Sequence, residues 1–195
     1  MISAVNRFLL IILLAFSAQV GAFNQDDLER LRTTGHCADC DLWDADLTTI
    51  NLRGANLGGT FLEQANLRGA DLSQADLHGA TLFRADLTEA NLSGANLSGA
   101  NLTEANLSRA NLTNADLSNS NLSRANLKGT NLHGTQLKNA IFDETALRSL
   151  VDAKHLNVSR LSEDYRARYH AIVEAIRVAE ENRRLAEQKR KQAEE

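Results

Sequence analysis

Leucine, or once phenylalanine, occupies every fifth position of this chain over more than half of its length. The series runs without a break from Leu42 to Leu147, which gives 22 centres, and only Phe142 among them is not leucine. A period of five matches neither the two-residue alternation of a strand nor the 3.6-residue period of an α-helix. The chain therefore has to adopt a structure that returns to the same core every five residues.

The residues around each centre repeat as well. Two positions earlier the residue is alanine 15 times, threonine four times and serine once, and only Cys40 and Ile50 are larger. Residues two apart on an extended segment point the same way, so this small residue and the leucine face one core. The residue between them, Asn 11 times and Asp six times, faces outward. The next two residues turn the chain, and coils must stack because one coil cannot bury its own leucines.

Charges separated by 20 residues indicate how many pentapeptides make one coil. Side chains of alternating sign recur at this separation, namely Arg84, Glu104, Arg124 and Glu144, and also Glu89 with Arg109. Four pentapeptides per coil would stack them as cross-strand ion pairs, whereas three per coil would bring like charges together. The pattern favours four pentapeptides per coil.

The repeated segment ANLSGANLSGANLTEANLSRANL resembles the A(D/N)LXX signature of pentapeptide-repeat proteins. The resemblance extends over residues 41–147 and is highly specific. It implies a right-handed, quadrilateral parallel β-helix, and the handedness comes from the family alone.

Segments on both sides of the repeat are expected to close the open ends of the coil. Residues 23–36 read as a short helical cap, in which Asn24 and Asp27 resemble a capping box and Gly35 ends the helix. The β-helix itself is expected over residues 37–147.

The segment after the repeat is expected to contain two helices. Residues 148–160 read as a C-terminal cap with a short helix over 149–155, and residues 161–195 as a helix that is first amphipathic and then charged. Its apolar stripe consists of Leu161, Tyr165, Tyr169, Ile172 and Ile176. The stripe either docks on the β-helix or pairs with another copy of the chain, and the sequence favours neither.

The first 22 residues have the layout of a secretory signal peptide. Arg7 precedes a short apolar run over 8–18, and small residues follow at 20–22. We expect cleavage after Ala22, which leaves a periplasmic or secreted protein with no stable membrane span. An uncleaved anchor is disfavoured because the run is about half of the roughly 20 residues that a spanning helix needs.

Cys37 and Cys40 form a CxxC pair at the start of the repeat. In an oxidising compartment two thiols this close can form a disulfide. Cys37 falls at a leucine-type centre and Cys40 at a small-residue position, so both are expected to face the core of the first coil. We therefore favour structural packing, with or without a disulfide, over redox catalysis, which needs a βαβ context, or zinc binding, which needs four ligands.

Four apolar side chains depart from the outward polar pattern. Phe61 replaces the Asn or Asp before a centre, and Trp43 and Phe83 follow centres at an outward position, so that the three aromatics lie on successive coils. Ile141 breaks the pattern on the same side. We predict that they form an apolar patch, covered either by the C-terminal helix or by a protein partner.

The sequence indicates a scaffold rather than an enzyme. It contains no Ser–His–Asp set, paired carboxylates or phosphate-binding loop, and we expect no cofactor and no metal. The formal charge of −4 argues against nucleic-acid binding. We expect an exported, non-enzymatic protein that binds an unidentified protein partner, with self-association through the C-terminal helix as a further option.

The family resemblance also implies an alternative function, because some pentapeptide-repeat proteins mimic DNA and bind topoisomerases. Those targets are cytoplasmic, so the signal peptide disfavours this alternative. Charge disfavours it too, since residues 41–147 hold 12 acids and seven interleaved bases, whereas a DNA mimic needs a continuous acidic face.

Export predicts a defined mature N-terminus. N-terminal sequencing of the protein from its native cells should begin near Phe23, because the small residues before it are what a signal peptidase reads. Intact Met1 in the soluble cytoplasm would contradict export and revive the topoisomerase alternative.

Overall fold

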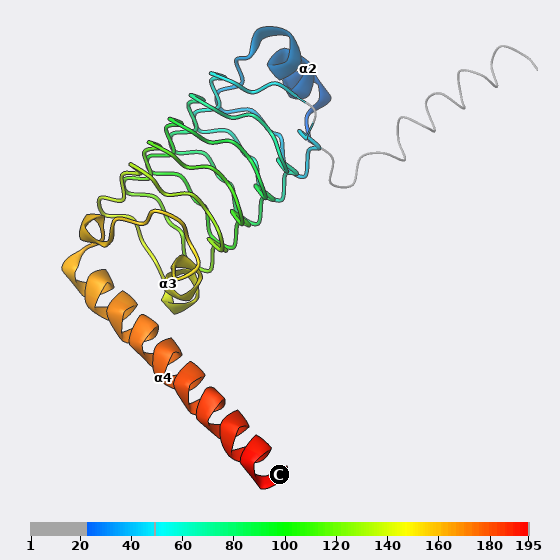
Figure 1. Cartoon of the computed structure of the whole chain (residues 1–195). Helices are drawn as coiled ribbons and strands as arrows, with labels where there is room; N and C mark the ends of the chain where they lie inside the picture. Colours follow the sequence, from blue (N-terminus) through cyan, green and yellow to red (C-terminus); the bar gives the residue numbers. More distant parts are fainter. Residues whose placement is uncertain (1–22, 49, 195) are drawn as a thin grey trace, which may run out of the picture.

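The computed structural model describes residues 23–48 and 50–194. The predicted signal peptide, residues 1–22, lies outside the described residues. Figure 1 shows a coiled rod with one helix, α2 (Gln25–Thr34), across its first end and two helices, α3 (Glu144–Leu150) and α4 (Glu163–Glu194), at its other end.

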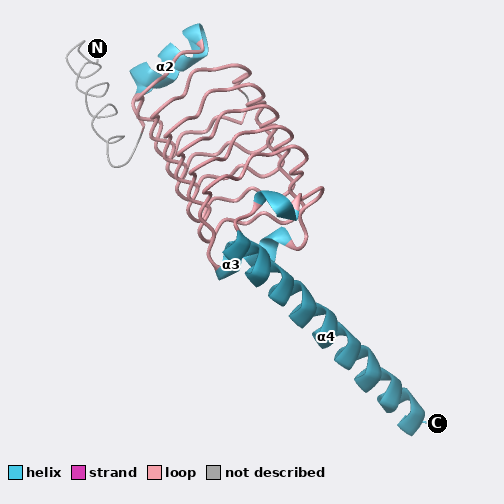
Figure 2. Ribbon diagram, turned by 90° about the vertical axis from the view of Figure 1, so that its left-hand side faces the viewer, coloured by secondary structure: helices cyan, strands magenta, loops and turns pink. Residues whose placement is uncertain are grey.

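Successive coils pair in parallel at a separation of 20 residues. The bridges join the outward residue before each centre to its counterpart on the next coil, from His36 with Asn56 to Asn121 with Ile141. Four pentapeptides therefore make one coil, as the charge spacing predicts. Each paired stretch is very short, so Figure 2 draws the coils as loops, and the whole is a β-helix solenoid.

Each side of a coil ends in a tight turn with a positive backbone φ. The amide after the turn donates to the carbonyl of the preceding centre, as from Ala100 to Leu97 over 3.1 Å. The residue before that amide has positive φ, which glycine adopts at no steric cost, as at Gly99 with φ 69°. Arg84 and Glu104 adopt it with full side chains, at φ 58° and 60°. Charged residues can therefore occupy the corners, where they stack on those of the next coil.

The core consists of leucine columns that run along the rod. The centres from Leu42 to Leu122 are fully buried, and the alanines beside them are buried too. Where threonine takes the small position inside the coil, its hydroxyl donates to a backbone carbonyl 23 residues earlier, as from Thr60 to Cys37 over 2.6 Å. These threonine hydroxyls are thus satisfied by the neighbouring coil.

Helix α2 closes the first end of the rod. The Asn24 side chain accepts from the amide of Asp26 at 3.0 Å, and Gly35 ends the helix with φ 68°. Two leucines of the helix are buried against the first coil. The predicted capping box is wrong, because Asp27 does not bond back to Asn24. Its carboxylate instead accepts from the backbone amide of Asp41 at 2.9 Å and ties the helix to the coil.

The coil ends one repeat earlier than the sequence period predicts. The leucine series continues to Leu147, but the chain leaves the coil after Phe142 and forms α3. Asp143 caps α3, since its carboxylate accepts a backbone amide of the first turn at 2.9 Å. Leu147 is buried as a residue of α3, so it fits both the five-residue period of the coil and the buried face of a helix. The predicted end of the β-helix at 147 and the predicted helix over 149–155 are therefore wrong in their bounds.

The chain then returns to the last coil before the final helix. Lys154 bridges to Asn131 in parallel, at a separation of 23 rather than 20 residues. A short 3-10 helix, η1 (Val158–Arg160), leads into α4, which points away from the rod (Figure 1, Figure 2). Among residues 23–48 and 50–194, no helix combines the length and hydrophobicity of a membrane span.

Leu97 lies in a middle coil and is fully buried. We expect Leu97→Ala to lower the free energy of unfolding by about 2–5 kcal/mol, because it removes buried surface and leaves a cavity. Leu97→Asp should prevent the central coils from folding, since an unpaired charge would be buried. Urea unfolding measures both, with Ile141→Ala at an exposed position as the matched control. A wild-type unfolding curve for Leu97→Asp would contradict the inward assignment.

Candidate functional site

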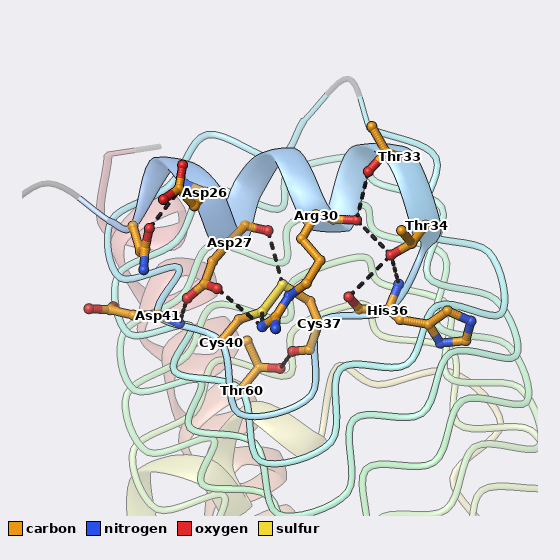
Figure 3. A network of polar contacts seen from close by, with 11 residues as sticks. Asp26, Asp27, Arg30, Thr33, Thr34, His36, Cys37, Cys40, Asp41 and Thr60 are labelled. Atoms are coloured by element: carbon orange, nitrogen blue, oxygen red, sulfur yellow. Dashed lines mark hydrogen bonds and ion pairs between the residues drawn. A yellow bond between two sulfur atoms is a disulfide. The ribbon is translucent and has the colours of Figure 1, made fainter.

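The two cysteines form a disulfide directly beneath α2. Cys37 and Cys40 are bonded to each other, with their Cα atoms 5.2 Å apart, and neither is exposed. Figure 3 shows the pair below the helix, with Arg30 and Asp27 reaching towards it from above. The Arg30 guanidinium lies 2.6 Å from the Cys40 sulfur and forms an ion pair with Asp27 at 3.1 Å. Burial beneath this network gives the disulfide a packing role at the cap. Within the described residues, no three His, Cys, Asp or Glu side chains group as metal ligands.

The outward Asn and Asp rows serve the backbone. In most repeats the side-chain oxygen accepts from the backbone amide two residues later, as Asn96 Oδ1 does from the Ser98 amide at 3.1 Å. These rows also link neighbouring coils. The side-chain amide of Asn91 donates to the carboxylate of Asp71 at 3.1 Å, and the side-chain amide of Asn111 donates to the side-chain oxygen of Asn91 at 3.1 Å. Hydrogen bonds from Ser73 lower the pKa of Asp71. These rows hold the turns and the coils together, and need no ligand to explain them.

The corner charges form a ladder of alternating sign. Glu104 accepts from Arg84 at 2.7 Å on one side and from Arg124 at 2.8 Å on the other, and Arg109 donates to Glu89 at 3.0 Å on a different corner. The hydrogen bond from Arg84, followed by the nearby positive charges, lowers the pKa of Glu104. The charge spacing seen in the sequence is thus confirmed for these pairs. The predicted fourth member, Glu144, instead lies in α3.

The three outward aromatics line one groove on the side of the first coils. Trp43, Phe61 and Phe83 surround an open hollow of about 660 Å³, which we call the aromatic groove. Phe61 is 48% exposed, in a position where the repeat normally has Asn or Asp. The sequence register therefore placed these three side chains together correctly. Ile141 lies in the same column as Phe61 and is 49% exposed, but four coils away, so it is not part of the groove.

Carboxylates surround the aromatic groove. Asp27 from α2, Asp39 and Asp41 from the first coil and Glu63 from the second all line it. The first three gather at the end near the α2 cap. At the other end the Arg84 guanidinium lies 4.8 Å from the centre of the Phe83 ring, so one cation already stacks on an aromatic face there. The groove therefore joins apolar faces to an acidic end, a combination suited to a partner with both apolar and basic side chains.

The acidic end of the groove could not be found from the repeat alone. Asp27 belongs to α2, outside the periodic segment, and reaches the groove only because its carboxylate binds the backbone of Asp41. Its position depends on how the cap sits on the coil. The sequence signal available for it was the Asp27–Arg30 spacing in the helix, which predicts a local ion pair and not a place on the groove.

Helix α4 does not cover the aromatic groove, so the first of the two covers that the sequence allowed is wrong. Its apolar stripe packs on the other end of the rod, where Leu161 and Ile172 are buried and Tyr165, Tyr169 and Ile176 are partly buried. The Tyr165 hydroxyl accepts from the Phe142 amide at 3.2 Å, and the two rings meet edge to face at 5.4 Å. Partial burial raises the pKa of Tyr169. The stripe thus covers the apolar end of the final coil.

Sequence comparison identifies the repeat. The profile described as "Pentapeptide repeats (8 copies)" matches residues 45–82, 82–119 and 105–143, which together span just over half of the chain. No curated protein sequence matches significantly.

Several solved structures of repeat proteins are similar to this chain. A pentapeptide repeat protein (Rfr23) from the cyanobacterium Cyanothece 51142 is 34% identical, with a TM-score of 0.60, over 62% of this chain and 95% of its own. One from the Arabidopsis thaliana thylakoid lumen is 27% identical, with a TM-score of 0.33, over 60% and 87%. QnrB1, a plasmid-mediated fluoroquinolone resistance protein, is 21% identical, with a TM-score of 0.30, over 63% and 72%. The first of these relatives implies a right-handed β-helix solenoid.

The buried disulfide should stabilise the capped end. Replacing both cysteines, Cys37→Ala with Cys40→Ala, should lower the free energy of unfolding by roughly 2 kcal/mol, the loop-closure value for so short a loop. Urea unfolding measures the change, and alkylation of the unfolded protein checks the bond, since both thiols should react only after reduction. Thiols that react without reduction in protein purified from an oxidising compartment would contradict the disulfide.

Proposed function

Because this chain belongs to the pentapeptide-repeat family, we propose that it is an exported, non-enzymatic scaffold whose aromatic groove binds another protein. In this proposal the scaffold is a right-handed, quadrilateral β-helix, and its four sides hold surface residues in fixed columns. The polar rows and corner ladders keep most of these columns occupied by structural contacts. The aromatic groove is the place where the columns carry residues that the fold does not require.

The observation that carries the proposal is the exposure of the aromatic groove. Phe61 has 48% of its surface exposed, although asparagine or aspartate at the same position would hold the turn better. A large apolar side chain in solvent costs free energy that contact with a partner would recover. Aromatic side chains are also the residues enriched at protein-binding hot spots.

Export is supported by two independent features of the chain. The N-terminal residues have the layout of a signal peptide. The bonded pair Cys37 and Cys40 is of the kind that persists in oxidising compartments and is rare in the cytosol. We propose that the mature chain acts in the periplasm or outside the cell.

The surface charges favour this function over DNA mimicry. On the corner column that faces solvent beside the groove, Arg84 and Arg124 enclose Glu104, so positive and negative groups alternate from coil to coil. A protein that imitates the DNA backbone must present negative charge without such interruption. We therefore place the interaction at the groove and with a protein.

The proposal is tested by a pull-down from the exported fraction of native cells. The bait with Phe61→Asn and Phe83→Ser restores the usual polarity of the repeat, and should lose proteins that the wild-type bait retains. Ile141→Asn is the matched control, because Ile141 is equally exposed in the same column but lies outside the groove. Identical sets of bound proteins for the wild type and the folded double variant would overturn the proposal.

A further inference from the structure

The second half of α4 is a free arm. Every described side chain from 177 to 192 is exposed, whereas the apolar stripe of the first half packs on the rod up to Ile176. The arm is held as a helix by its own ion pairs, such as Arg177 with Glu181 and Lys191 with Glu187. In Figure 1 and Figure 2 it extends beyond the end of the rod that is opposite α2.

The arm presents two exposed apolar side chains on one face. Val178 is 42% exposed and Leu185 is 48% exposed. They lie seven residues apart, two helical turns, and therefore on the same side of the helix. That side is opposite the docked stripe, since Ile176 and Ile172 are turned by about half a revolution from Leu185 at 100° per residue. A partner could contact Val178 and Leu185 without displacing α4 from the rod.

The spacing of these two side chains matches the aromatic groove. Seven helical residues extend about 10.5 Å. Trp43 and Phe83 are two coils apart, which at strand spacing is about 10 Å, with Phe61 between them. A helix lying along the rod axis would therefore set one apolar side chain at each end of the groove.

The charges of arm and groove are complementary at both ends. Residues 182–192, around and beyond Leu185, contain five bases against one acid. Asp27, Asp39 and Asp41 form the acidic end of the groove. Around Val178, residues 174–181 contain three acids against one base, Arg177, which pairs with Glu174 and Glu181, and the matching end of the groove is the one beside Arg84. If the helix lies with its basic C-terminal part at the acidic end of the groove, opposite charges meet at both ends. The reverse direction brings like charges together. Neither Arg184 nor Lys189 forms an ion pair with another described residue of its own chain.

We propose that the aromatic groove of one chain takes the α4 arm of a second copy, with Leu185 near Trp43 and Val178 near Phe83. The inference rests on the proposed function, because it names the partner of the same groove. Groove and arm lie at opposite ends of the molecule, so a chain cannot fill its own groove. Each contact is head to tail and leaves a free groove and a free arm, so copies assemble into open chains or rings.

The test uses full mature chains that each retain one half of the contact. The first variant, Phe61→Asn with Phe83→Ser, has an altered groove and an intact arm. The second, Val178→Glu with Leu185→Glu, has an altered arm with good helix formers and an intact groove. Sedimentation velocity measures the mass of each variant alone and of an equimolar mixture, with Ile141→Asn as the control for surface substitution.

We expect the wild type and Ile141→Asn to grow in mass with concentration, and each double variant alone to weaken this association by at least about tenfold. The mixture should form a complex that stops at two chains, because it contains only one intact groove for each intact arm. Circular dichroism should show that both variants keep their folded coil and helix.

Three results would overturn the inference. A monomeric wild type would exclude a second copy as the partner, and the pull-down could still support a different protein in the groove. Self-association of the groove variant alone would mean that arms pair with arms. A mixture that stays monomeric, while the wild type assembles, would mean that the contact uses other surfaces.

Discussion

The structure depends on the burial of leucine between stacked coils. A single coil of four pentapeptides has four leucines directed inward and no second layer to cover them, so each coil is stable only against its neighbours. The 20-residue pairing of backbone groups sets this stack, and the small residue beside each leucine lets the walls approach. Every other feature follows from keeping the register, since a shift by one residue would turn the leucines outward.

Stacking buries the leucines of the middle coils. At the two ends of the rod, the leucines of the first and last coils need another cover. The first coil is covered by α2, which is tied down by the Asp27 carboxylate and lies over the Cys37–Cys40 disulfide. The last coil is covered by α3 and by the first half of α4, with Tyr165 against Phe142. The two caps differ in charge and shape, so the rod has a direction although its repeat is nearly uniform. Surface chemistry follows from the caps as much as from the coil.

The long sides of the rod are largely committed to structure. Asn and Asp side chains hold turns, and corner charges such as Arg84 and Glu104 pair from coil to coil. Against this background, the aromatic groove and the face of α4 with Val178 and Leu185 stand out, because they carry exposed apolar side chains. Their placement at opposite ends makes a directional contact between molecules physically reasonable.

The sequence by itself determined the coil. The five-residue period determined which residues face the core, the 20-residue charge spacing favoured four pentapeptides per coil, and the same register brought Trp43, Phe61 and Phe83 together. These features are local or periodic, so one repeat predicts the next. The tertiary structure alone decided that the coil ends at Phe142, because Leu147 fits a helix as well as a repeat. It also decided that α4 packs on the end of the rod and that Asp27 completes the groove, because both depend on how non-repeating segments meet the coil.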